Sequence, residues 1–156
     1  MSTRYFALVL GIAFLLVGIM GFIPALLTPP AVGGGHEHNL TVTGPGHGYL
    51  LGLFHVNVLH NIVHLVFGAW GVFAYFASFD AARLYARVVA ISYGLLTIMG
   101  LIPQLNTVFG LVPIHGHDVW LHAVIALAAA YFGWATAPAP ATRPAGEYTD
   151  DSGVVL

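Results

Sequence analysis

Four long apolar stretches, separated by polar segments or by segments rich in glycine and proline, dominate the chain. Each stretch is close to the roughly 20 residues that a helix needs to cross the hydrocarbon core of a bilayer. They predict membrane-spanning helices at about residues 5–24, 50–77, 82–103 and 117–136. A cleaved signal peptide is an alternative for the first stretch, but its apolar run is longer than the roughly 7–15 residues of a typical signal. We therefore predict an all-α membrane protein, a four-transmembrane-helix bundle within residues 1–137.

The composition indicates that lipid surrounds this bundle. Of the 156 residues, 58% are hydrophobic and only 6% are charged, whereas a soluble domain carries about 25% charged residues. The net charge of -2 gives no reason to expect nucleic acid as a partner, and the absence of cysteine excludes disulfides and thiolate metal sites. Residues 138–156 are rich in alanine, proline, threonine and aspartate, and we predict that they form a disordered cytoplasmic tail.

The arginines predict how the bundle is oriented. Arg4 precedes the first stretch, Arg83 and Arg87 follow the turn between the second and third, and Arg143 follows the fourth. The two remaining loops contain no lysine or arginine. Because cytoplasmic loops carry an excess of these residues, we expect both termini and the middle turn to lie in the cytoplasm.

Two pairs of similar segments suggest an internal repeat. Ile19–Thr28 and Ile98–Thr107 share the pattern Ile-Met-Gly-x-Ile-Pro-x-Leu-x-Thr, and His55–His60 and His117–His122 both read His-x-x-x-Leu-His. Two parallel helical-hairpin repeats, related by an axis along the membrane normal, would explain this similarity. A chance likeness between the starts of two amphiphilic helices is the simpler alternative.

Polar side chains concentrate near the outer ends of the second and fourth predicted helices. Four of them share one face of the second helix at about 100° per residue: Asn57, His60, Asn61 and His64. The same face continues into Gly68 and Gly71, where a neighbouring helix can approach closely. On the fourth helix, Asp118 and His122 are four residues apart and share a face, although Asp118 could instead be the N-cap. Because polar groups are costly in hydrocarbon, we expect these side chains to face the interior of the bundle.

Three interpretations of His60, His64 and His122 remain open. They could form interhelical hydrogen bonds that only stabilise the bundle. They could bind haem, with His60 and His122 facing one another, or a transition metal with Asp118 as a further ligand. They could also relay protons or bind a small polar ligand. Four further side chains could hydrogen-bond to the imidazole rings and so fix their orientation: Asn57, Asn61, Gln104 and Asn106. No serine or threonine stands beside a suitable base, so we predict no catalytic residue.

Three runs of sequence resemble an uncharacterised family of bacterial membrane proteins. They are Phe54–Gly68, which contains Asn-x-x-His-Asn-x-x-His, Asn106–Pro113, and Asp118–His122, which reads Asp-Val-Trp-Leu-His. The family consists of small four-helix proteins known only as a domain of unknown function, and the resemblance covers about residues 4–134. Its motifs include the positions Asn57, His60, His64, Asn106, Asp118 and His122.

The resemblance implies the four-helix fold and a location in the bacterial cytoplasmic membrane, but it supplies no activity. We expect a non-enzymatic structural or accessory protein that contacts the lipid bilayer and associates with itself or with a larger membrane complex. The alternative is a haem- or transition-metal-binding membrane protein, active in redox chemistry or ion handling, that uses the inward histidines.

Overall fold

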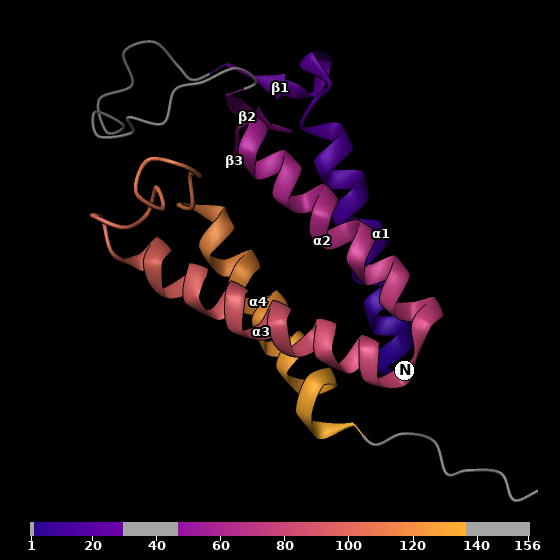
Figure 1. Ribbon diagram of the computed structural model, residues 1–156. Helices are drawn as coiled ribbons and strands as arrows, with labels where there is room; N and C mark the ends of the chain where they lie inside the picture. The colour runs from indigo at the N-terminus through magenta and orange to yellow at the C-terminus, as the bar shows by residue number, and fades with distance from the viewer. Residues whose placement is uncertain (1, 30–46, 137–156) are drawn as a thin grey trace, which may run out of the picture.

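The computed structural model describes residues 2–29 and 47–136 (Figure 1). Its helices are α1 (Thr3–Met20), α2 (Val58–Ala77), α3 (Phe79–Leu101) and α4 (His117–Ala130), and α4 continues into a π-helical turn, η2 (Tyr131–Ala135). A short 3-10 helix, η1 (Pro24–Leu26), precedes the strands β1 (Leu27–Thr28), β2 (Gly48–Leu50) and β3 (Phe54–Val56). Within the described residues, four helical segments are long and apolar enough to cross a membrane, when α4 is counted together with η2. This confirms the predicted four-helix fold and indicates a multi-pass membrane protein.

The start of the second helix was predicted too early. The apolar residues from 48 to 56 do not extend α2 but form an antiparallel sheet in the order β1-β2-β3, with Leu50 opposite both Leu27 and Phe54. The turn between β2 and β3 uses two residues with positive φ, Leu51 at 53° and Gly52 at 73°. Helix α2 then begins directly after the N-cap Asn57.

Asp118 is not the N-cap of the fourth helix, which was one of its two predicted roles. Gly116 is the N-cap of α4 and makes no side-chain cap hydrogen bond, while Asp118 lies inside the first turn. Asp118 is therefore a buried side chain of the helix rather than its cap.

The helices are arranged as two hairpins, with α1 packed along α2 and α3 packed along α4. Glycine permits the closest approach between α1 and α2, as the sequence predicted for Gly68 and Gly71. A Cβ atom on Gly68 would lie 2.7 Å from the backbone nitrogen of Leu15, and one on Gly71 would lie 2.8 Å from the carbonyl oxygen of Ala7. Neither distance leaves room for a side chain.

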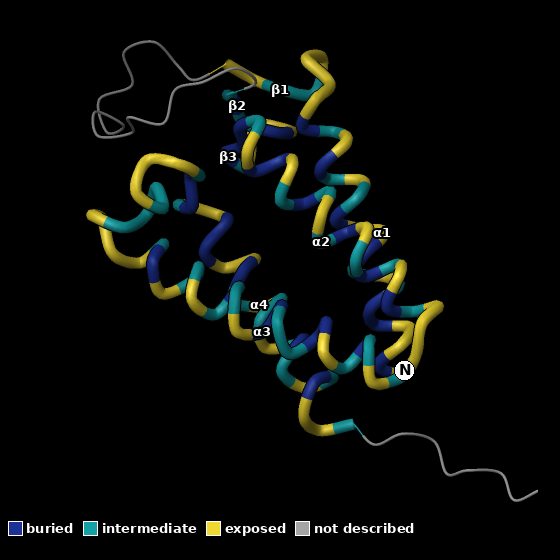
Figure 2. The backbone as a smooth tube through the Cα atoms, in the orientation of Figure 1, coloured by how far each residue is buried: buried dark blue, intermediate teal, exposed yellow. Residues whose placement is uncertain are grey.

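The two hairpins meet most closely at one end and diverge toward the other (Figure 1). We call the first the terminal end, because Thr3, the turn between α2 and α3, and Thr136 lie there, and the second the loop end, because the sheet lies there. Much of the core between the hairpins consists of small residues and aromatic rings, including Ala7, Ala74, Ala82, Ala86, Phe6 and Tyr85. Buried residues line the inner faces of the helices, and exposed ones cover the outer faces (Figure 2).

Side chains at the terminal end hold the two ends of the described chain together. The hydroxyl oxygens of Thr3 and Thr136 are 2.5 Å apart. The guanidinium groups of Arg83 and Arg87 donate to the carbonyl oxygens of Thr136 and Gly133, each at 2.9 Å. Both ends of the described chain therefore lie on the same side of the bundle, whereas the predicted tail from residue 138 and Arg143 fall outside the described residues.

Candidate functional site

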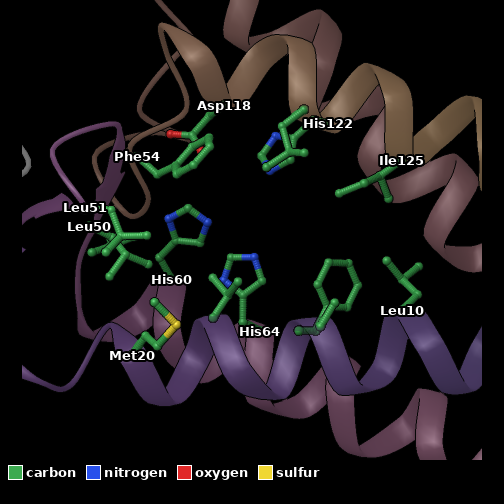
Figure 3. Close-up of a pocket in the computed structure, with 15 residues that line it drawn as sticks. Leu10, Met20, Leu50, Leu51, Phe54, His60, His64, Asp118, His122 and Ile125 are labelled. Carbon is green, nitrogen blue, oxygen red and sulfur yellow. The ribbon is translucent and has the colours of Figure 1, made fainter. Parts of the chain in front are cut away.

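A cavity of about 320 Å³ lies between the two hairpins, near the loop end (Figure 3). Helices α1 and α2 form one wall of the cavity and α4 forms the opposite wall. The β2–β3 region closes the cavity at the loop end. Its polar lining consists of His60, His64, Asp118 and His122. The remaining lining is apolar: Leu10, Ala13, Phe14, Val17, Met20, Leu50, Leu51, Phe54, Val56, Leu121 and Ile125.

Helix α2 contributes two stacked imidazoles to this cavity. The ring centroids of His60 and His64 are 4.6 Å apart with an angle of 21° between the planes, as expected for side chains one helical turn apart. Nδ1 of His60 lies 3.2 Å from the carbonyl oxygen of His55. A carbonyl can only accept, so Nδ1 carries the proton and Nε2 of the neutral ring is left as an acceptor.

Helix α4 contributes Asp118 and His122, each 3% exposed. The ring centroids of His122 and His60 are 6.5 Å apart, so the two hairpins bring their histidines close together across the cavity (Figure 3). Three of the lining side chains keep a buried polar atom without a hydrogen-bond partner in the described structure: Nδ1 of His64, Oδ2 of Asp118 and Nδ1 of His122. The polar face predicted for α2 and α4 thus holds for these four residues.

Aromatic side chains separate the cavity from the core at the terminal end. Phe14 of α1 stacks on Tyr93 of α3, with ring centroids 5.3 Å apart and an angle of 15°. The ring centroids of Phe14 and His64 are 5.4 Å apart. Those of Tyr93 and His122 are 4.9 Å apart, with the rings edge to face. The sequence offered no signal for the role of Phe14, because α1 is apolar on every side.

The structure places none of the four supporting side chains predicted from sequence in the wall of the cavity. Asn57 accepts from the backbone N–H of His60 at 2.8 Å and donates to the carbonyl oxygen of Leu111 at 2.9 Å. Asn61 donates to the carbonyl oxygen of Gly21 at 2.8 Å and so holds α2 against α1.

The other two supporting residues lie after α3. Gln104 is exposed, and Asn106 is half-buried, with its backbone carbonyl accepting from Ile114 at 2.7 Å. Among the four, only Asn57 therefore acts on a cavity histidine directly, and it does so through the backbone of His60.

A second group of histidines, which sequence reasoning did not assemble, lies beside the sheet. Nδ1 of His55 is 2.6 Å from Nε2 of His115, its Nε2 contacts Nε2 of His47, and its ring stacks on Tyr49. Burial, together with the neighbouring His115, His47 and His60, lowers the pKa of His55 from its ordinary 6.5 to about 3. The apolar pattern had assigned residues 50–57 to a longer second helix, so it could not indicate the sheet beside which these histidines meet.

The chemistry available in the cavity is that of a small-molecule site. Such sites are mostly apolar, with a few polar groups that orient the ligand, and the smallest have volumes of about 300 Å³. The described residues contain no group of three or more histidine, cysteine, aspartate or glutamate side chains arranged to hold a metal ion. His60 and His122 come from facing hairpins and form a candidate pair for ligation from both sides.

Comparison with known proteins supports the resemblance found in the sequence. The family described as "Domain of unknown function (DUF4383)" matches residues 4–135. No curated protein and no solved structure matches the chain.

Proposed function

We propose that this chain, which belongs to the family described as a domain of unknown function (DUF4383), is a non-enzymatic membrane protein that binds a small ligand between its hairpins. The observation that carries the proposal is the set of partnerless polar atoms on His64, Asp118 and His122 around one apolar cavity. A buried polar atom without a partner costs roughly 1–3 kcal/mol. An occupant of the cavity would offset part of that cost once small rotations of these side chains let the buried atoms pair with it.

Binding without turnover fits the lining of the cavity, which includes no serine, threonine or lysine side chain that could act as a nucleophile. We therefore propose an accessory role, in which the protein holds its ligand alone, as a homo-oligomer or as part of a larger complex in the bacterial cytoplasmic membrane. Exposed apolar side chains on its outer faces, such as Val66, Phe73 and Leu127, would contact lipid or such a partner.

The test is to identify small molecules that copurify with the protein after reconstitution in nanodiscs. Ala13 lines the cavity, so Ala13→Phe should fill it. Ala77→Phe is the matched control, because Ala77 is exposed at the end of α2 and lies outside the cavity. We expect wild type and Ala77→Phe to retain the same molecule and Ala13→Phe to lose it. Identical bound material in all three would refute the proposed site.

The spacing of His60 and His122 favours haem or a metal ion as a second candidate. A metal bound to two imidazoles lies about 2 Å from each nitrogen, which is compatible with ring centroids 6.5 Å apart. The hydrogen bond from His60 Nδ1 to a carbonyl oxygen is also the usual support of a ligating histidine. A Soret band or stoichiometric metal that disappears in both His60→Ala and His122→Ala would establish this candidate, and colourless, metal-free protein would dismiss it.

A further inference from the structure

The cavity changes from polar to apolar along its length. Its four polar side chains all come from the first two turns of α2 and α4, near the loop end, whereas Leu10 and Ile125 line the opposite part. Seven residues of α4 separate Asp118 from Ile125, which corresponds to about 10 Å, and ten residues of α1 separate Met20 from Leu10, about 15 Å. The cavity therefore has its polar side chains at one end, among apolar neighbours such as Met20 and Leu50, and only apolar side chains at the other end, inside the membrane-spanning part of the bundle.

We infer that this cavity binds a membrane amphiphile with one short apolar tail and a small head that carries a hydroxyl group and no negative charge. The inference rests on the proposed function and specifies the ligand of that same cavity. The head lies near Asp118 and His60, and the tail follows α1 and α4 toward the terminal end. A ligand bound in this way would be parallel to the lipids of one leaflet, namely those whose head groups lie on the side of the loop end.

The charges of the described residues argue against an anionic head. The described arginines all lie at the terminal end, where Arg4 donates to Tyr75, Arg83 to Thr136 and Arg87 to Gly133. The cavity itself contains a carboxyl group and three imidazoles. A phosphate or carboxylate head would therefore meet Asp118 without a guanidinium or ammonium partner, and like charges in a medium of low dielectric constant repel strongly.

The hydrogen-bonding groups favour a hydroxyl over a head that only accepts. Nε2 of His60 is an acceptor, because Nδ1 donates to the backbone. The oxygen atoms of Asp118 are acceptors when the group is ionised, and Oδ2 has no partner. A hydroxyl can donate to either of these groups and accept from His64 or His122, whose neutral rings can each donate from one nitrogen.

The ligand can reach the cavity from the lipid. Ala13 of α1 and Leu121 of α4 both line the cavity and are themselves exposed, so the cavity reaches the surface between the hairpins. Both residues belong to membrane-spanning helices. A molecule dissolved in the bilayer therefore meets the opening directly, without crossing water.

The inference can be tested by photolabelling the protein in phosphatidylcholine nanodiscs with a ten-carbon primary alcohol that carries a diazirine at the far end of its tail. We expect adducts on Leu10, Phe14 or Ile125, at the apolar end of the cavity. An excess of 1-decanol should reduce them at least fivefold, whereas equal membrane concentrations of decane or decanoate should not. Asp118→Leu should weaken labelling roughly tenfold, the factor that corresponds to about 1.4 kcal/mol, and Ala77→Phe should leave it unchanged.

The results distinguish a failure of the proposed hydroxyl head from a failure of the binding site itself. Cavity adducts that decane or decanoate removes as well as decanol would overturn the hydroxyl head while leaving a ligand site in place. Adducts on α1 that lie on lipid-facing residues only, together with identical copurified material in Ala13→Phe and wild type, would overturn the site itself. Competition in the wild-type protein alone decides the question of the hydroxyl head, so a failure of Asp118→Leu to fold does not obscure that answer.

Discussion

His60 and His64 differ in one respect although they are stacked on the same helix. His60 donates to a backbone carbonyl, whereas Nδ1 of His64 is buried and has no partner in the described structure. An apolar residue at position 64 would remove an unpaired polar atom, but the same change at position 60 would leave the carbonyl of His55 without its donor. The two histidines should therefore respond in opposite directions to the same substitution.

We predict that His64→Leu raises the thermal midpoint of the ligand-free protein in detergent by roughly 2–4 °C, equivalent to about 1 kcal/mol. His60→Leu should lower it by a similar amount. Both variants should lose ligand binding, as expected when stability and function compete at one site. Circular dichroism melting curves would measure the shifts, and a loss of stability in His64→Leu would contradict the assignment of its unpaired nitrogen.

His55 provides a prediction on pH. Its folded-state pKa of about 3 lies below the ordinary 6.5, so below pH 6.5 the unfolded chain takes up a proton that the folded protein does not. Stability is then complete above pH 6.5 and decreases as the pH falls toward 3, by at most roughly 2 kcal/mol at pH 5. The charged or titratable groups near this ring are His47, His115, His60 and Tyr49.

The measurement is the difference in thermal midpoint between pH 7.5 and pH 5. We expect His55→Gln, which can still form hydrogen bonds, to show a smaller difference than wild type. His117→Gln is the control, because His117 is an exposed histidine only two residues from His115. Equal pH dependence in wild type and His55→Gln would show that His55 does not titrate as proposed.

The sequence could predict the inward direction of His60, His64, Asp118 and His122 because helical periodicity and the cost of polar groups in lipid act on each residue separately. Asn57 and Asn61 are buried as predicted, but the sequence could not predict that they lie outside the lining of the cavity. Asn57 caps α2, and Asn61 bonds to Gly21 on another helix, so both roles depend on where distant backbone groups lie. Local periodicity does not contain that information.

At the scale of elements, hydropathy predicted the four helices but not the sheet. Residues 48–56 are as apolar as the helix that follows, so no change in hydrophobicity marks the start of α2. The strands exist because β2 pairs with β1, about 20 residues earlier in the chain, and with β3. Pairing partners this far apart are invisible to a window that moves along the sequence, which is why the predicted boundary was wrong.

The contact between α1 and α2 gives a prediction at this scale. We expect Gly68→Ala to destabilise the protein by roughly 1–3 kcal/mol, because its Cβ would overlap the backbone of α1 near Leu15 and Gly11. Gly94→Ala on α3 is the matched control, since a Cβ there meets nothing within 4 Å. Alanine is a better helix former than glycine, so Gly94→Ala should be neutral or stabilising by about 0.5–1 kcal/mol. Equal effects in thermal melts would contradict the close packing.

For the whole molecule, packing at the terminal end and the cavity near the loop end have a common cause. Alanine and glycine let the helices approach closely where Ala7, Ala74 and Ala82 are buried. Toward the loop end, the larger rings of Phe14 and Tyr93 stack between the hairpins, where α1 and α3 are further apart (Figure 1). The sequence predicted the number of helices and their pairing in hairpins, but the angle between hairpins depends on contacts among all four helices and could not be read from any one of them.

The orientation of the bundle in the membrane is the remaining prediction, and the chain suits its test because it has no native cysteine. Asp80 is exposed at the terminal end, which carries Arg4, Arg83 and Arg87, and Leu111 is exposed in the segment between α3 and α4 at the loop end. The excess of cations predicts that the terminal end lies in the cytoplasm. In intact spheroplasts, a membrane-impermeant maleimide should therefore label Leu111→Cys at once and Asp80→Cys only after permeabilisation. The reverse pattern would invert the orientation, and with it the leaflet toward which the polar end of the cavity faces. Labelling of both positions in intact spheroplasts would mean that the two ends are not separated by the bilayer, and the membrane-spanning interpretation itself would then fail.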